Sequence, residues 1–109
     1  QVTRDHSRVQ ELIDMGQITP EEARLRPDRN IITRAVGIAA DVDVDLLDLQ
    51  LTHGDRLLLC TDGLSGLCTD REMSEILSSH PIEEVTEQLI AAANRRGGYD
   101  NITVVVIEN

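Results

Sequence analysis

Aromatic side chains are almost absent from this sequence: Tyr99 is the only one, and there is no Trp or Phe. Single-stranded nucleic acids are bound largely by stacking bases on aromatic rings, so a surface of that kind is excluded. Basic residues are also scarce, because 10 Lys and Arg stand against 20 Asp and Glu, giving a formal net charge of −10. Such a chain repels phosphate backbones and anionic lipids. We therefore expect no nucleic-acid partner.

Cysteines and long apolar runs are lacking as well. Cys60 and Cys68 are the only two cysteines and do not have the spacing of a redox or zinc pair; we expect Cys60, in an apolar run, to be a small buried hydrophobe. No apolar run approaches the roughly 20 residues of a membrane span, and no signal peptide is recognisable. We therefore expect no membrane contact from this segment and a cytoplasmic location, free or on the cytoplasmic face of an anchored parent. Because Gln1-Val2-Thr3 resembles the tail of a strand, the chain is expected to begin inside a domain.

Capping residues mark the helices that the sequence predicts. Ser7 can cap a first helix, and Thr19 forms a capping box with Glu22 at the start of a second. Thr69 forms the same box with Glu72. The predicted helices cover residues 7–15, residues 19–26, a segment from 69 onward and residues 81–94.

Apolar and β-branched segments predict the strands. Residues 31–36 and 102–107 are rich in β-branched side chains, and residues 57–60 form a continuous apolar run expected to be buried on both faces. Residues 41–51 alternate between apolar and polar with one slip, which indicates a half-buried strand with a bulge. With 109 residues and 40% hydrophobic content, the chain suits one small α+β domain with antiparallel pairing.

Two aspartates stand at strand ends beside glycines. Asp62 follows the apolar run and precedes Gly63, and Asp100 follows Gly97-Gly98-Tyr99 and precedes the last strand. Carboxylate oxygens are the ligands that Mg²⁺ and Mn²⁺ prefer. An Asp-Gly pair on its own is most often only a turn, so the neighbouring residues decide the interpretation.

Those neighbours resemble a known family in several places. Residues 58–65, LLCTDGLS, resemble the Asp-Gly signature of the type 2C protein phosphatases, and residues 97–104, GGYDNITV, resemble their C-terminal Asp-Asn signature. Residues 5–7, 16–23 and 29–37 resemble the bacterial branch of that family. The resemblance covers nearly the whole chain in order.

The resemblance implies a fold and a metal site. The fold would be part of a two-sheet antiparallel β-sandwich flanked by helices, with residues 1–109 as the C-terminal half of one catalytic domain and a flap-like segment at about 7–30. The complete domain would bind two Mn²⁺ or Mg²⁺ ions, with a third, weaker ion. Asp62 and Asp100 would both be ligands of one of these ions, and this half would hold no further catalytic residue.

The implied function is that of a protein serine/threonine phosphatase, which hydrolyses phosphoserine and phosphothreonine monoesters with a metal-activated water. Its partners would be phosphoproteins, the substrates of a Ser/Thr kinase. No Asp-Gly-x-Gly-Gly motif, which carries the family's metal-bridging Asp, stands in this chain. The fragment alone is therefore expected to be inactive. Gly66 stands where some relatives have a carboxylate near the third ion, which puts that ion in doubt here.

Other interpretations of the sequence have less support. One alternative is a degenerate phosphatase-fold module that binds or regulates a partner without catalysis; retention of both Asp62 and Asp100 favours the enzyme. A calcium loop beginning at Asp41 fails, because Leu46 and Thr52 stand where Gly and Glu are required. The three scattered histidines are expected to be turn or surface residues; they are His6, His53 and His80.

Overall fold

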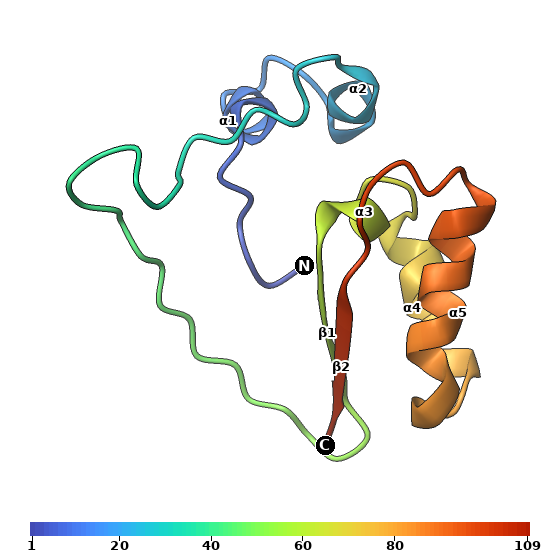
Figure 1. Ribbon diagram of the computed structural model, residues 1–109. Helices are drawn as coiled ribbons and strands as arrows, with labels where there is room; N and C mark the ends of the chain where they lie inside the picture. Colours follow the sequence, from blue (N-terminus) through green and yellow to red (C-terminus); the bar gives the residue numbers. More distant parts are fainter. The chain divides into compact units, whose positions relative to one another are not determined.

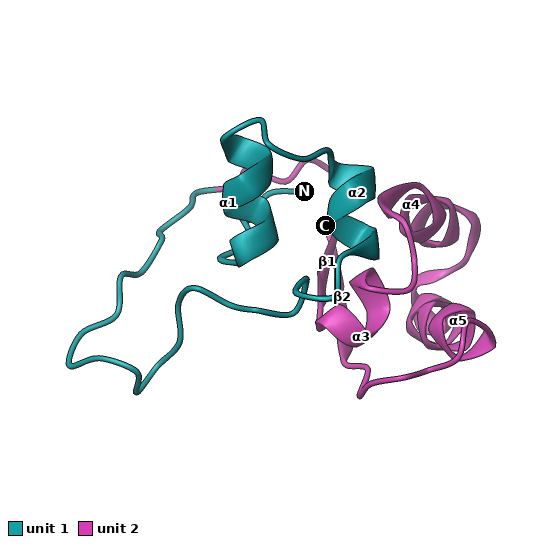
Figure 2. Ribbon diagram, turned by 90° about the horizontal axis from the view of Figure 1, so that it is seen from above, with its two compact units in different colours: residues 1–48 teal, residues 49–109 magenta.

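A computed structural model describes all residues, Gln1–Asn109, and they form two compact units (Figure 2). Unit 1 is Gln1–Asp48 and unit 2 is Leu49–Asn109. In chain order the elements are α1 (Arg8–Asp14), α2 (Pro20–Leu25), β1 (Arg56–Cys60), α3 (Asp62–Ser65), α4 (Asp70–Ser79), α5 (Ile82–Arg95) and β2 (Val104–Glu108). None of these helices has both the length and the apolar character needed to cross a bilayer.

Unit 1 contains the helices α1 and α2, which begin where the capping residues predict. The Ser7 hydroxyl accepts a hydrogen bond from the Gln10 N–H at 3.2 Å. Thr19 and Glu22 form a complete capping box, with bonds of 2.8 and 3.1 Å. These bonds satisfy amide groups that the first helical turn leaves without partners. Both helices lie in the flap-like segment at about 7–30, and its flap role stays a prediction.

Two strands expected in the first half of the chain are not formed. Residues 31–36 contribute only one isolated bridge, between Ser7 and Ile32, and residues 41–51 are extended without ladder hydrogen bonds. Val44 and Leu46 there are 72% and 90% exposed. A strand needs a continuous ladder of hydrogen bonds with a neighbouring strand. Residues 31–33 bond only to the short segment 6–8, and no strand pairs with residues 41–51. The predictions of strands at 31–36 and 41–51 were therefore wrong for this chain.

Unit 2 is built on an antiparallel pair, β1 and β2, with Leu58 opposite Val106. The strands are joined through α3, α4 and α5, and α4 and α5 lie against one face of the sheet (Figure 1). On the other face Leu59 and Val105 are each 51% exposed. The apolar run in β1 is thus covered on one face only, and Cys60 is exposed. The expectations of a strand buried on both faces and of a buried Cys60 were wrong.

The core of unit 2 is aliphatic, as the scarcity of aromatic residues requires. Its largest fully buried side chains are those of Leu64, Leu89, Val85 and Cys68. Leu64 comes from α3, which has only four residues and is too short to be stable by its own hydrogen bonds. Burying one leucine side chain contributes about 1.5–3 kcal/mol. Packing of Leu64 therefore fixes α3 at the end of β1.

One arginine ties the end of α4 to both strands. Arg56 of β1 donates from Nη1 to the carbonyl oxygens of Leu77 and of His80, the latter at 2.7 Å. Its Nε donates to the Glu108 carboxylate of β2 at 2.5 Å. The last carbonyls of a helix have no partners within it, so this guanidinium supplies the donors that they need.

Candidate functional site

Asp62 is the first residue of α3 and follows β1 after a single residue, Thr61. Thr61 has extended backbone angles, φ −82° and ψ 165°, which turn the chain sharply from strand into helix. The Asp62 side chain has no hydrogen-bond or ion-pair partner, and the residue is exposed. Its carboxylate is therefore open to a ligand.

Asp100 lies in the loop between α5 and β2. Gly97 and Gly98 end α5 with positive φ angles of 115° and 53°, a conformation that side chains with a Cβ rarely adopt. One carboxylate oxygen of Asp100 accepts the N–H of Asn101 at 2.7 Å. This bond orients the exposed carboxylate and leaves its second oxygen without a bond.

Thr61 joins the two segments that carry the aspartates. Its N–H donates to the Thr103 oxygen at 3.0 Å, which extends the ladder of β1 and β2 by one residue. Its hydroxyl accepts the Thr103 N–H at 3.0 Å and donates to the Asn101 oxygen at 3.3 Å. A threonine at this position before a helix usually caps the helix through its hydroxyl; here the hydroxyl bonds the neighbouring loop instead.

Gly63 allows these segments to approach closely. A Cβ at residue 63 would lie 2.1 Å from the Asn101 backbone oxygen and 3.3 Å from the Ile102 side chain. Asp62 therefore stands between two residues, Thr61 and Gly63, that both meet Asn101. Asp100 directly precedes Asn101, so the two aspartates lie on facing segments held together by backbone contacts.

The pair of carboxylates suits a hard divalent cation in part. Mg²⁺ and Mn²⁺ take carboxylate oxygens and often retain several waters, and both side chains are exposed with free oxygens. However, no group of three or more His, Cys, Asp or Glu side chains converges anywhere in the chain. The chain thus offers two candidate ligands, and the remaining coordination positions would be filled by other groups.

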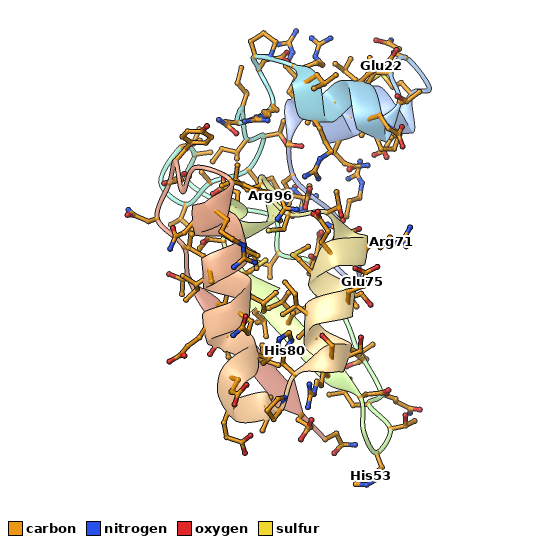
Figure 3. The ribbon with its side chains drawn as sticks, turned by 90° about the vertical axis from the view of Figure 1, so that its right-hand side faces the viewer. Glu22, His53, Arg71, Glu75, His80 and Arg96 are labelled. Atoms are coloured by element: carbon orange, nitrogen blue, oxygen red, sulfur yellow. The ribbon has the colours of Figure 1, made fainter.

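The histidines lie elsewhere and have other partners. His6 contacts the Asp45 carboxylate at 2.7 Å in unit 1. His80 follows α4 and contacts the Ile76 oxygen at 3.2 Å, while His53 lies in the turn before β1 (Figure 3). None of them joins a group of possible metal ligands.

Sequence reasoning missed two residues that shape the site. The Thr61 hydroxyl links the Asp62 and Asp100 segments, and Gly63 gives the space for their contact. A Thr between a strand and Asp-Gly was the only signal in the sequence. It could not be interpreted without knowing that residues 101–103 lie alongside.

The sequence and fold of the chain match those of known phosphatases. The family model described as Stage II sporulation protein E matches residues 18–109. Protein phosphatase PhpP of Streptococcus pneumoniae is 44% identical over 108 residues, which are 98% of this chain and 44% of that protein. The crystal structure of the serine/threonine phosphatase Stp1 from Staphylococcus aureus superposes with a TM-score of 0.94 at 39% identity, covering 100% of this chain and 43% of that one.

A further matching structure contains metal ions. The catalytic domain of the serine/threonine phosphatase PstP, solved with two manganese ions, superposes with a TM-score of 0.80 at 40% identity, covering 99% of this chain and 44% of that one. The chain thus spans a little under half the length of these relatives.

The α+β fold, with its small antiparallel sheet and helices, is that of the bacterial serine/threonine phosphatases. The chain belongs to the SpoIIE family of type 2C phosphatase domains, and the resemblance noted in its sequence is confirmed.

Proposed function

We propose that this chain forms part of the catalytic domain of a metal-dependent protein serine/threonine phosphatase. In this proposal Asp62 and Asp100 bind one Mn²⁺ or Mg²⁺ ion. The observation that carries it is the junction at Thr61, which sets two exposed carboxylates on facing segments. Relatives named as serine/threonine phosphatases support the reaction, and the manganese ions in PstP support the choice of metal.

The proposed metal ion would activate water, and local structure positions its two proposed ligands. A divalent cation at this place would lower the pKa of a coordinated water and offset the negative charge of the phosphoryl group. Asp62 is positioned by the start of α3, and Asp100 is oriented by the N–H of Asn101. Two neighbouring carboxylates repel each other unless a cation lies between them. A cation bound by Asp62 and Asp100 would therefore relieve repulsion between two side chains whose segments are joined at Thr61.

The proposed substrates are phosphoserine and phosphothreonine residues of proteins modified by a Ser/Thr kinase. Asp62 and Asp100 both lie at the surface, so a phosphoryl group carried on a protein chain can reach them. The net charge of −10 disfavours binding of a phosphate group by this chain alone. Bound cations would remove that repulsion.

The test compares three variants of the full-length protein that contains these residues: Asp62→Asn, Asp100→Asn and the control Asp70→Asn. Asp70 is an exposed acid in the first turn of α4. Hydrolysis of a phosphothreonine peptide with Mn²⁺ should fall by about 100-fold or more in the first two, because each loses an anionic ligand. Calorimetry should show weaker Mn²⁺ binding in the same two.

Near-normal turnover of both variants at saturating Mn²⁺ would show that the ligand assignment is wrong. A wild-type protein that binds the phosphopeptide without hydrolysing it would instead support a binding module that has lost catalysis.

A further inference from the structure

Tyr99, the only aromatic residue of the chain, directly precedes Asp100 and is 83% exposed. Large apolar rings are usually removed from water in a folded protein. Its exposure is therefore unusual for a chain whose core could have used it. The core of unit 2 is filled by aliphatic side chains instead.

The ring lies over the backbone of Gly97. A Cβ at residue 97 would stand 2.4 Å from the ring carbon Cζ of Tyr99 and 2.7 Å from its hydroxyl oxygen. The glycine thus leaves the space that the ring occupies. The side chain has a defined place on the loop while most of its surface faces solvent.

The loop that carries Tyr99 is anchored on both sides. At its start Arg96, labelled in Figure 3, forms an ion pair with Glu72 of α4. The Gly98 N–H donates to the Ala93 oxygen at 3.2 Å. At its end the Asn101 oxygen accepts from Thr61 at 3.3 Å. An anchored ring loses little conformational freedom when a ligand covers it, which favours binding.

The ring is within reach of a substrate chain whose phosphoresidue lies at Asp100. Neighbouring Cα atoms are about 3.8 Å apart, and an extended peptide advances about 3.3 Å per residue. Side chains one to three positions from the phosphoresidue can therefore lie on the ring of Tyr99. A free phosphoamino acid has no such side chain.

We propose that Tyr99 is a specificity-determining residue that contacts a Lys or Arg side chain of the substrate peptide, one to three positions from the phosphoserine or phosphothreonine. The inference rests on the proposed function. An exposed ring attracts a cation over its face. The chain carries a net charge of −10, and a metal ion at Asp62 and Asp100 would offset only the two charges of those carboxylates, so the chain still favours a cationic side chain over an acidic one.

The experiment uses the full-length protein and three substrates: a phosphothreonine peptide with Arg two positions away, the same peptide with Leu there, and free O-phosphothreonine. In Tyr99→Ala the kcat/KM for the Arg peptide, divided by that for phosphothreonine, should fall about two- to fivefold through KM. The corresponding ratio for the Leu peptide should fall less. Tyr99→Phe should keep the wild-type ratios, because the face of the ring remains. Glu87→Ala truncates an exposed side chain on α5 and serves as control.

Unchanged ratios in Tyr99→Ala, an equal fall for the two peptides, or failure of Tyr99→Phe to keep the ratios would overturn the inference. A wild-type protein that hydrolyses none of the three substrates contradicts the proposed function, and this inference with it. Hydrolysis of all three with unchanged ratios contradicts the role of Tyr99 alone.

Discussion

The backbone oxygen of Asn101 lies so close to Gly63 that a Cβ at residue 63 would stand 2.1 Å from it. Neither partner in this contact is the end of a flexible side chain. The Asn101 oxygen belongs to the backbone, and Gly63 lies in α3, which is held in place by the fully buried Leu64. The contact therefore fixes the separation of the segments that carry Asp62 and Asp100.

Gly63→Ala should push these segments apart. We expect a loss of about 1–3 kcal/mol in the free energy of unfolding, typical of overpacking, and a fall in Mn²⁺-dependent phosphatase activity of the full-length protein. Urea denaturation and turnover of a phosphopeptide measure the two effects. Ser74→Ala, an equally small change at an exposed position of α4, should alter neither. Wild-type activity and stability in Gly63→Ala would contradict the close contact.

Arg56→Met should destabilise the full-length protein by about 1–3 kcal/mol, because the Leu77 and His80 carbonyls lose their donor. Arg56→Lys should recover only part of this, since one ammonium group cannot reach both those carbonyls and Glu108. The free energy of unfolding from urea denaturation measures the change.

The matched control for Arg56 is Arg71→Met. Arg71 pairs with Glu75 along the surface of α4 at 2.9 Å (Figure 3), and the two side chains are 88% and 64% exposed. An exposed pair of this kind contributes about 0.5 kcal/mol or less. Equal losses for the two arginines would show that Arg56 acts only as a surface charge.

Asp28 should make the contacts between α1 and the end of α2 sensitive to acid. The Arg26 guanidinium, which donates to it at 2.8 and 3.0 Å, lowers the pKa of the Asp28 carboxyl below its usual value, and Arg8 of α1 adds to this. A lowered carboxyl pKa stabilises the fold above the unfolded pKa, and this stability is lost as the pH falls through the folded pKa. NMR titration of the Asp28 carboxyl carbon should show a midpoint that rises in Arg26→Gln and not in the distant Arg95→Gln. An unchanged midpoint in Arg26→Gln would contradict the pairing.

The 109 residues alone should show no measurable phosphatase activity, even with excess Mn²⁺. Asp62 and Asp100 would supply only two ligands, and no third His, Cys, Asp or Glu joins them. The assay is turnover of a small phosphate ester by the purified chain. As a positive control, the chain can replace the segment that it matches in PhpP of Streptococcus pneumoniae. Mn²⁺-dependent hydrolysis by the chain alone, abolished in Asp62→Asn, would contradict this expectation.

The sequence correctly predicted features that depend on residues close together in the chain. The capping boxes of Thr19 with Glu22 and Thr69 with Glu72 formed as expected, because both partners lie within one helical turn. The aspartates were recognised from motifs that resemble a family, and their binding of metal stays a prediction.

Features that depend on distant segments could not be predicted in the same way. Residues 41–51 have the alternation of a strand but no strand beside them. The burial of β1 was overestimated, since an apolar run does not reveal that helices cover only one face. The contact of Gly63 with Asn101 joins residues 38 positions apart and follows only from the pairing of β1 with β2.

Because Tyr99 is the only aromatic side chain, all of the intrinsic ultraviolet fluorescence of this chain comes from one ring beside Asp100. No tryptophan is present to absorb its excitation energy or mask its emission. The chain therefore carries a built-in optical reporter on the loop proposed to bind metal and substrate. If Mn²⁺, a paramagnetic ion, binds at Asp100 as proposed, its addition should quench that single signal, and no attached dye is needed to follow it.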